Sequence, residues 1–200
     1  MKDCKTMLDS VRVLPVVVLK ALEDTVPTLS ALRDGGIPAA EITFRTACAR
    51  DAIALAAKEF PDMYIGAGTV INATQANEAI DAGAGFIVSP GLSREVAAVC
   101  KERGIPYFPG CATPTEIMEA ISLGFDVVKF FPANVYGGLG AIKALSAPFP
   151  QVKFLPTGGV DLSNIRDFLA FDKIVAVGGS FMMKGDIREN CKQLMEVLAK

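Results

Sequence analysis

The strongest constraint on the fold is a regular alternation of short β-rich runs with longer amphipathic, alanine-rich stretches along the whole chain. Strands that alternate with helices predict a parallel sheet, because each helix returns the chain to the edge where the next strand starts. The predicted strands are Val13–Leu19, Ala40–Phe44, Tyr64–Thr69, Phe86–Ser89, Tyr107–Phe108, Val127–Phe131, Lys153–Pro156 and Lys173–Val177. The predicted helices are Asp24–Asp34, Ala47–Glu59, Ala73–Ala82, Arg94–Arg103, Pro114–Ser122, Leu139–Leu145, Ser163–Phe171 and Ile187–Leu198.

Eight evenly spaced strand–helix units favour closure of the parallel sheet into a barrel. We therefore predict one (β/α)8 TIM barrel domain over residues 1–200, with a short helix before the first strand. Glycines such as Gly104 and Gly124 fall where the helices should end, as expected for C-cap positions. A doubly wound open sheet is the alternative, and the lack of an opening G-x-G-x-x-G motif disfavours it.

The chain contains no histidine, which excludes a histidine base, Ser-His-Asp and Cys-His dyads, and histidine-ligated metals. Acid–base chemistry must therefore fall to Glu, Asp, Lys, Tyr or bound water. A net charge of −2 offers no basic surface for nucleic acid and no polybasic patch for a membrane. The five scattered cysteines include no C-x-x-C pair, and the N-terminus does not resemble a signal peptide. We expect a cytoplasmic protein that uses neither a metal nor a cofactor.

Two predicted strands carry ionisable side chains on the face that would point into the barrel. Because side chains alternate along a strand, Glu41, Thr43 and Arg45 share one face of the second strand. Lys129 shares a face of the sixth strand with Phe131. An isolated charge in an apolar interior is costly, so Lys129 and Glu41 are expected to relieve that cost together.

Lys129 and Glu41 are the candidate catalytic residues. A desolvated lysine near other cations gives up its proton more readily and becomes the amine that can attack a ketone. In a chain without histidine, Glu41 is the obvious candidate for a proton shuttle. The alternatives are a structural ion pair between the two residues, or a lysine that extends to solvent at the end of its strand.

Arg45 and Thr69 are candidates for binding a substrate carboxylate. Arg45 ends the second predicted strand and can pair with a carboxylate through two hydrogen bonds. Thr69 closes the run Gly66-Ala67-Gly68-Thr69, where a ligand can approach the backbone closely and the hydroxyl can donate. The alternatives are a surface arginine and a tight strand end.

Two glycine-containing loops are candidates for binding a phosphate. Thr157, Gly158 and Gly159 follow the seventh predicted strand, and Gly178, Gly179 and Ser180 follow the eighth. Barrels most often bind phosphate at these two loops, through backbone N–H groups and a helix N-terminus. Either Gly-Gly pair alone is weak support, whereas the two at both positions are stronger.

With these residues assembled, the chain resembles the 2-keto-3-deoxy-6-phosphogluconate (KDPG) and 4-hydroxy-2-oxoglutarate (KHG) aldolases, which are class I, metal-independent pyruvate aldolases. The resemblance extends over nearly the whole chain. Its most specific segments are Glu41-Ile42-Thr43-Phe44-Arg45-Thr46, Gly66-Ala67-Gly68-Thr69-Val70, Ser89-Pro90-Gly91-Leu92, Pro109-Gly110, Val128-Lys129-Phe130-Phe131-Pro132-Ala133 and Pro156-Thr157-Gly158-Gly159-Val160.

This resemblance implies a role for each candidate residue. Lys129 would form the imine and Glu41 would act as acid and base, while Arg45 and Thr69 would hold the pyruvate carboxylate. The phosphate end would be bound by the loops after the seventh and eighth strands, through the backbones of Gly158, Gly159 and Gly179, and Ser180. The resemblance also implies a homotrimer.

The expected reaction is cleavage of KDPG to pyruvate and glyceraldehyde 3-phosphate, with cleavage of KHG to pyruvate and glyoxylate as a further activity. The galactonate epimer of KDPG is an alternative substrate, because it differs only at C4. Two different functions also fit these residues. One is a phosphosugar isomerase or epimerase that uses Glu41 and Lys129 without a covalent bond, and the second is a barrel that binds a phosphorylated ligand without turnover.

Overall fold

The predicted alternation of strands and helices is confirmed in the computed structural model, which describes Leu8 and residues 11–199. Every paired strand runs parallel to its neighbour. The strands are β1 (Val13–Val17), β2 (Ala39–Thr43), β3 (Tyr64–Gly68), β4 (Ile87–Val88), β5 (Tyr107–Phe108), β6 (Val127–Phe130), β7 (Lys153–Pro156) and β8 (Val177–Gly179).

The strands form one sheet of six, in the order β5-β4-β3-β2-β1-β8, and one of two, β6-β7. Isolated bridges lie at both junctions between these sheets. Gly110 pairs with Lys129 beside β5 and β6, and Thr157 pairs with Gly178 beside β7 and β8. Apart from the pairing of the first strand with the last, β1 with β8, neighbouring strands are consecutive in the chain, and the described strands make a curled parallel sheet.

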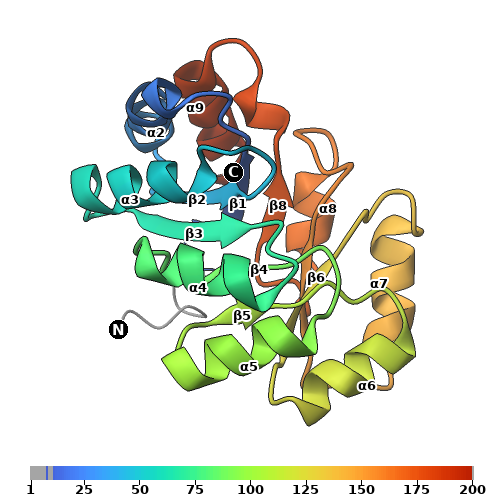
Figure 1. The fold of residues 1–200 in the computed structure, drawn as a ribbon. Helices are drawn as coiled ribbons and strands as arrows, with labels where there is room; N and C mark the ends of the chain where they lie inside the picture. Colours follow the sequence, from blue (N-terminus) through green and yellow to red (C-terminus); the bar gives the residue numbers. More distant parts are fainter. Residues whose placement is uncertain (1–7, 9–10, 200) are drawn as a thin grey trace.

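The helices lie around the outside of the strands (Figure 1). Their bounds agree with the predicted ones to within a few residues, and Arg94–Arg103 and Pro114–Ser122 agree at both ends. The helices are η1 (Leu22–Asp24), α2 (Thr25–Asp34), α3 (Ala49–Glu59), α4 (Ala73–Asp81), α5 (Arg94–Arg103), α6 (Pro114–Ser122), α7 (Gly138–Ser146), α8 (Ile165–Leu169), η2 (Phe181–Met183) and α9 (Ile187–Ala199). The predicted short helix before the first strand falls mainly on residues outside the described part of the chain.

The last strand was placed too early by the sequence pattern. Lys173–Val177 is the most apolar run in this region, but only Ile174 in its first part forms a bridge, with Phe154. The strand begins at Val177 because pairing with β1 begins there, and Gly178 continues it opposite Leu14. A Cβ on Gly178 would overlap the side chain of Thr157, so the glycine permits close approach of two strands.

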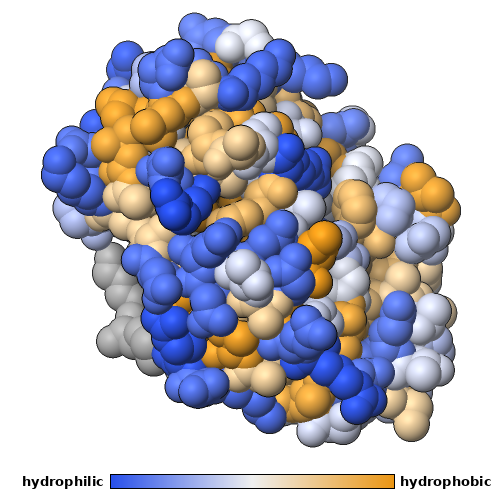
Figure 2. Space-filling model, in the orientation of Figure 1, coloured by the Kyte–Doolittle hydropathy of each residue, from blue (hydrophilic) through white to orange (hydrophobic). Residues whose placement is uncertain are grey.

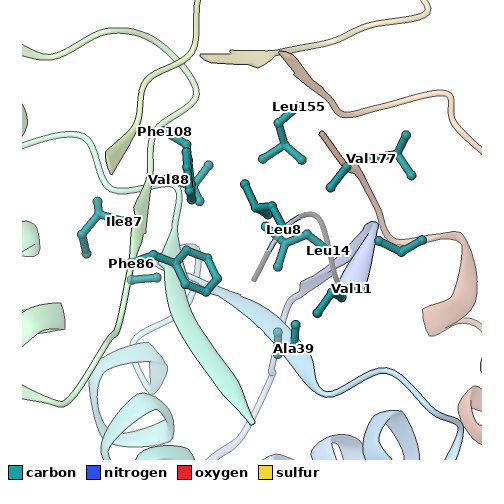
Figure 3. Packing of buried hydrophobic residues seen from close by; sticks show 14 of the residues in the cluster. Leu8, Val11, Leu14, Ala39, Phe86, Ile87, Val88, Phe108, Leu155 and Val177 are labelled. Carbon is teal, nitrogen blue, oxygen red and sulfur yellow. The ribbon is translucent and has the colours of Figure 1, made fainter. Parts of the chain in front are cut away.

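The interior is filled by apolar side chains from several strands. Figure 3 shows Leu8 in the middle of this cluster, with Phe86 and Leu155 reaching toward it from different sides, while Ile87 points away. Gly66 leaves room for the ring of Phe86, which a Cβ at that position would overlap. Close packing of this kind leaves little space for water, so any ionisable group in the interior must find its partner in the protein.

The outer surface mixes polar and apolar residues. Figure 2 shows hydrophobic residues exposed over η1 and α2, where Leu22 and Val26 are among the exposed large side chains. Single exposed apolar residues of this kind are common on soluble domains. Buried charged side chains are more informative, and the two among the described residues, Glu41 and Lys129, both lie in the sheet interior.

Candidate active site

Lys129 and Glu41 form a buried ion pair inside the curled sheet. The Nζ atom of Lys129 on β6 lies 3.3 Å from Oε1 of Glu41 on β2, although the residues are 88 positions apart. The relative exposure is 2% for Lys129 and 0% for Glu41, so neither charge is screened by bulk water. The predicted inward direction of both side chains therefore brings an amine and a carboxylate into direct contact.

One oxygen of this carboxylate has no partner. Glu41 Oε2 is buried and makes no hydrogen bond within the described part of the chain. An unsatisfied buried carboxylate oxygen is costly and uncommon, and such groups often mark functional positions. Oε1 contacts the amine, and Oε2 remains able to accept a hydrogen bond from a substrate hydroxyl or a water molecule.

Neighbouring residues hold the pair in place. The backbone of Lys129 is tied to the segment after β5, since its N–H donates to Pro109 (2.8 Å) and its carbonyl accepts from Cys111 (2.8 Å). On β2, the hydroxyl of Thr43 donates to the carbonyl of Val17 (3.1 Å) at the end of β1. These hydrogen bonds hold β6 and β2 in place without the ion pair, so the backbone positions of Lys129 and Glu41 do not depend on the contact between their side chains.

Two residues beside the pair were not recognised as site residues from the sequence. Gly68 on β3 faces Glu41, and a Cβ at this position would overlap the carboxylate. The ring centroid of Phe131 lies 5.4 Å from Lys129 Nζ. Strand parity put Phe131 on the same face as Lys129, which was the available signal. For Gly68, the signal was only the glycine-rich run that ends at Thr69.

Arg45 and Thr69 lie together after the ends of β2 and β3. The register of these strands aligns Thr43 with Gly68, so β2 and β3 end side by side and the residues that follow them are close together. Arg45 Nε donates to Thr69 Oγ1 over 2.9 Å, and the guanidinium forms no ion pair with any described carboxylate. Thr69 has a φ of 56°, a left-handed conformation that is unusual for a β-branched residue. The hydroxyl of Thr69, held by this strained backbone, and the guanidinium of Arg45 beside it are suited to binding an anionic group.

The two predicted phosphate loops lie next to each other at the junction of β7 and β8. Thr157 is buried and bridges to Gly178, while Gly158 and Gly159 have φ values of 90° and 79°. Two successive left-handed residues turn the backbone sharply, and the carbonyls of Thr157 and Gly158 accept from Ala133 (2.9 Å) and Asn134 (3.0 Å). The loop after β7 is thereby tied to the loop after the lysine strand.

The loop after β8 brings Ser180 to the surface, where its side chain forms no cap bond to η2. A cavity of about 290 Å³ adjoins Ser180 between the end of β1 and α2. Lys20, which the sequence pattern did not single out, lines the same cavity and adds a positive charge near Ser180.

The described residues can also be checked for metal-ligand clusters, membrane-spanning helices and reactive thiols. No group of three or more Cys, Asp or Glu side chains there is arranged to hold a metal ion. None of the described helices has the length and apolar character that a bilayer-spanning segment needs. Burial raises the pKa of the Cys100 and Cys111 thiols to about 12 and that of Cys191 to about 11, so these thiols are unreactive near neutral pH.

Comparison with known proteins agrees with this geometry. A family model described as KDPG and KHG aldolase matches residues 4–197. The chain is 47% identical over 176 residues to a 2-dehydro-3-deoxy-phosphogluconate aldolase from Treponema pallidum, which covers 88% of this chain and 84% of that protein. It is 44% identical over 193 residues to the KHG/KDPG aldolase of Escherichia coli, with 94% and 91% covered.

Solved structures give the same result. The KDPG aldolase of Legionella pneumophila, with pyruvate captured as a covalent carbinolamine, superimposes with a TM-score of 0.89 at 40% identity over 96% of this chain and 95% of that one. The KDPG aldolase of Zymomonas mobilis with 3-phosphoglycerate gives a TM-score of 0.91 at 36% identity, over 98% and 95%.

Proposed function

The chain belongs to the KDPG and KHG aldolase family and is therefore a carbon–carbon lyase, and on this premise we propose that it cleaves KDPG through a Schiff base on Lys129. The products are pyruvate and glyceraldehyde 3-phosphate. The observation that supports this most is the buried contact of 3.3 Å between an amine and a carboxylate with a second, unpartnered oxygen. A nucleophile beside a proton acceptor is what imine chemistry requires.

In the first stage, Glu41 accepts a proton from the Lys129 ammonium, and the free amine attacks the C2 carbonyl of the substrate. The carbonyl oxygen takes up a proton, which gives a carbinolamine. Loss of water then leaves a protonated imine. Glu41 returns and removes these protons directly or through water, because it is the acid–base group within hydrogen-bond distance of the amine.

In the second stage, Glu41 takes the proton of the C4 hydroxyl through its free oxygen. The electron pair of the C3–C4 bond moves to the iminium, which leaves an enamine, and C4 departs as the aldehyde carbon of glyceraldehyde 3-phosphate. Protonation of the enamine at C3 and hydrolysis of the imine release pyruvate and restore Lys129.

Each end of the substrate has a proposed binding group. Arg45 and Thr69 hold the carboxylate, which is supported by their mutual contact of 2.9 Å and by the absence of an ion pair to Arg45 among the described carboxylates. The phosphate lies at the junction of β7 and β8. Thr157, the backbones of Gly158, Gly159 and Gly179, and the hydroxyl of Ser180 bind it there. The bridge between Thr157 and Gly178 supports this assignment, because it joins the two loops.

The molecular context follows from the same family assignment. We assign residues 1–200 to a single closed (β/α)8 barrel, supported by the bridges at both junctions between the sheets. We also propose a cytoplasmic homotrimer. Sedimentation equilibrium would measure the mass of the assembly. A monomer at micromolar concentration would contradict the trimer.

The covalent mechanism is tested by borohydride reduction. Incubation of the intact protein with pyruvate and borohydride is expected to give a stable adduct on the peptide that contains Lys129, identified by mass spectrometry. Lys129→Met and a sample without pyruvate serve as controls. The absence of an adduct in the wild-type protein would remove the covalent mechanism and favour a non-covalent isomerase or epimerase, or a barrel that binds without turnover.

The role of Glu41 is tested by Glu41→Gln, which keeps the size of the side chain but removes its basicity. We expect pyruvate binding to persist and cleavage to fall by about 10²-fold or more, the usual scale of general acid–base catalysis. Near-normal turnover would exclude Glu41 from proton transfer.

Substrate choice is tested with three compounds: KDPG, its galactonate epimer and KHG. The two glycine loops favour a phosphorylated substrate, so we expect a higher kcat/KM for KDPG than for KHG. The galactonate epimer keeps the phosphate, so its kcat/KM relative to that of KDPG measures selectivity at C4. Equal rates for KDPG and KHG would show that the junction of β7 and β8 contributes nothing to selectivity.

A further inference from the structure

We infer that the ring of Phe131 stabilises the positively charged imine on Lys129, an inference that rests on the proposed Schiff-base mechanism and extends it. Lys129 Nζ lies over the ring of Phe131 at 5.4 Å from its centroid. An aromatic face is electron-rich and attracts a cation within about 6 Å, most strongly when water is excluded. Lys129 is 2% exposed, so water is excluded on its side of the contact.

The ring matters because the charge on the Lys129 nitrogen alternates during the reaction. The nitrogen is neutral in the carbinolamine and in the enamine and positively charged in the iminium, and Glu41, the described carboxylate that pairs with Lys129, gains or loses a proton as these forms interconvert. The ring of Phe131 attracts only the cationic form. It therefore favours the iminium over the carbinolamine that precedes it and over the enamine that follows it.

The position of the ring also suits an intermediate that extends from Lys129 toward the phosphate loop. Phe131 directly follows the end of β6, two residues after Lys129, and it is half-buried. The same ring also lies beside the loop after β7, since a Cβ on Gly158 would be 3.4 Å from it, in ordinary contact. The ring is therefore next to both the reacting amine and the backbone proposed to hold the phosphate.

The competing explanation is that Phe131 only fills space, and stepwise fluorination separates the two. Fluorine withdraws electron density from the ring face with little change in shape, so a cation–π contact weakens in proportion to the number of fluorines. The full-length protein is prepared with phenylalanine, 4-fluoro-, 3,5-difluoro- or 3,4,5-trifluorophenylalanine at position 131. Imine formation is measured as the fraction of protein trapped by a short borohydride pulse at saturating pyruvate, because borohydride reduces the iminium and not the carbinolamine.

We expect the apparent equilibrium constant between the neutral carbinolamine and the iminium to fall stepwise, by about 3- to 10-fold across the series. The matched control is the same series at Phe130, which is fully buried on the opposite face of β6 and should leave the constant unchanged. A flat series at position 131, or equal losses at both positions, would overturn the inference.

Two conventional variants provide a second measurement if the fluorinated proteins fold poorly. Phe131→Tyr keeps an aromatic face and is expected to retain imine formation within about 2-fold, whereas Phe131→Leu keeps only apolar volume and should lose about 10-fold. Equal behaviour of the two would contradict a role for the ring. If wild-type protein forms no adduct with pyruvate, the proposed Schiff base itself fails, which is a separate result obtained before any variant is made.

Discussion

Gly68 on β3 leaves open the space that the carboxylate of Glu41 on β2 occupies. A Cβ at Gly68 would come far closer than 3.0 Å to Oε1 of Glu41, a separation that real Cβ atoms essentially never show. In the register of the two strands, Glu41 lies opposite Gly66 and Thr43 lies opposite Gly68. The carboxylate of Glu41 therefore reaches two residues further along β3, to Gly68. The position of the proposed acid–base group therefore depends on a residue without a side chain.

Gly68→Ala is expected to displace the Glu41 carboxylate from Lys129 and to lower kcat by about 10²-fold, the usual contribution of a positioned acid–base group. Overpacking should also cost about 1–3 kcal/mol in the free energy of unfolding. Steady-state kinetics and urea denaturation measure the two effects. Gly91→Ala is the matched control, since a Cβ at Gly91 meets nothing within 4 Å. Equal kinetics for the two variants would contradict this dependence on Gly68.

Lys129→Met is expected to lower the free energy of unfolding by about 3–5 kcal/mol, because it leaves Glu41 as an uncompensated buried charge. Adding Glu41→Leu removes that charge, so the double variant should regain most of the lost stability. Urea denaturation of the wild-type, single and double variants gives the coupling energy between the residues. A coupling near zero would mean that the pair of 3.3 Å is energetically unimportant.

Thr69 should show opposite effects on stability and on substrate binding. Its φ of 56° costs a β-branched residue about 1–2 kcal/mol, part of which glycine would recover. Thr69→Gly is therefore expected to raise the melting temperature but to increase the KM for KDPG, because the hydroxyl that contacts Arg45 at 2.9 Å is lost. Thr69→Ala loses the hydroxyl and keeps the strain, so its KM should rise without a gain in stability. An unchanged KM in both variants would remove Thr69 from the carboxylate site.

The buried cysteines predict a loss of stability in alkaline solution. Burial raises the pKa of the Cys100 and Cys111 thiols from 9.0 to about 12, so the folded state holds protons that the unfolded state releases above pH 9. Their contribution to stability is complete below pH 9 and is lost as the pH rises toward 12. Melting temperatures between pH 8 and 11 should fall less steeply in Cys100→Ala and Cys111→Ala than in wild type. Cys48→Ala, at a half-buried position, is the control and should follow the wild-type slope.

Local patterns in the sequence were sufficient to predict the order of strands and helices and the inward direction of the two charged side chains. Alternation along a strand is a local property, so Glu41 and Lys129 could be assigned to interior faces without knowing which strands are neighbours. The candidate roles of Lys129, Glu41, Arg45 and Thr69 followed from residue type and position at strand ends. Local patterns also misplaced the last strand, because its bounds depend on pairing with β1.

The tertiary structure alone decided which of these groups meet. The distance of 3.3 Å between Lys129 and Glu41 depends on the register of strands that are 88 residues apart in the chain, and no local pattern encodes that register. The same holds for the space at Gly68 and for the ring of Phe131 beside the amine, because both are defined by what lies across from them. The sequence thus determined which chemical groups face the interior, and packing between distant strands determined which of them can react together.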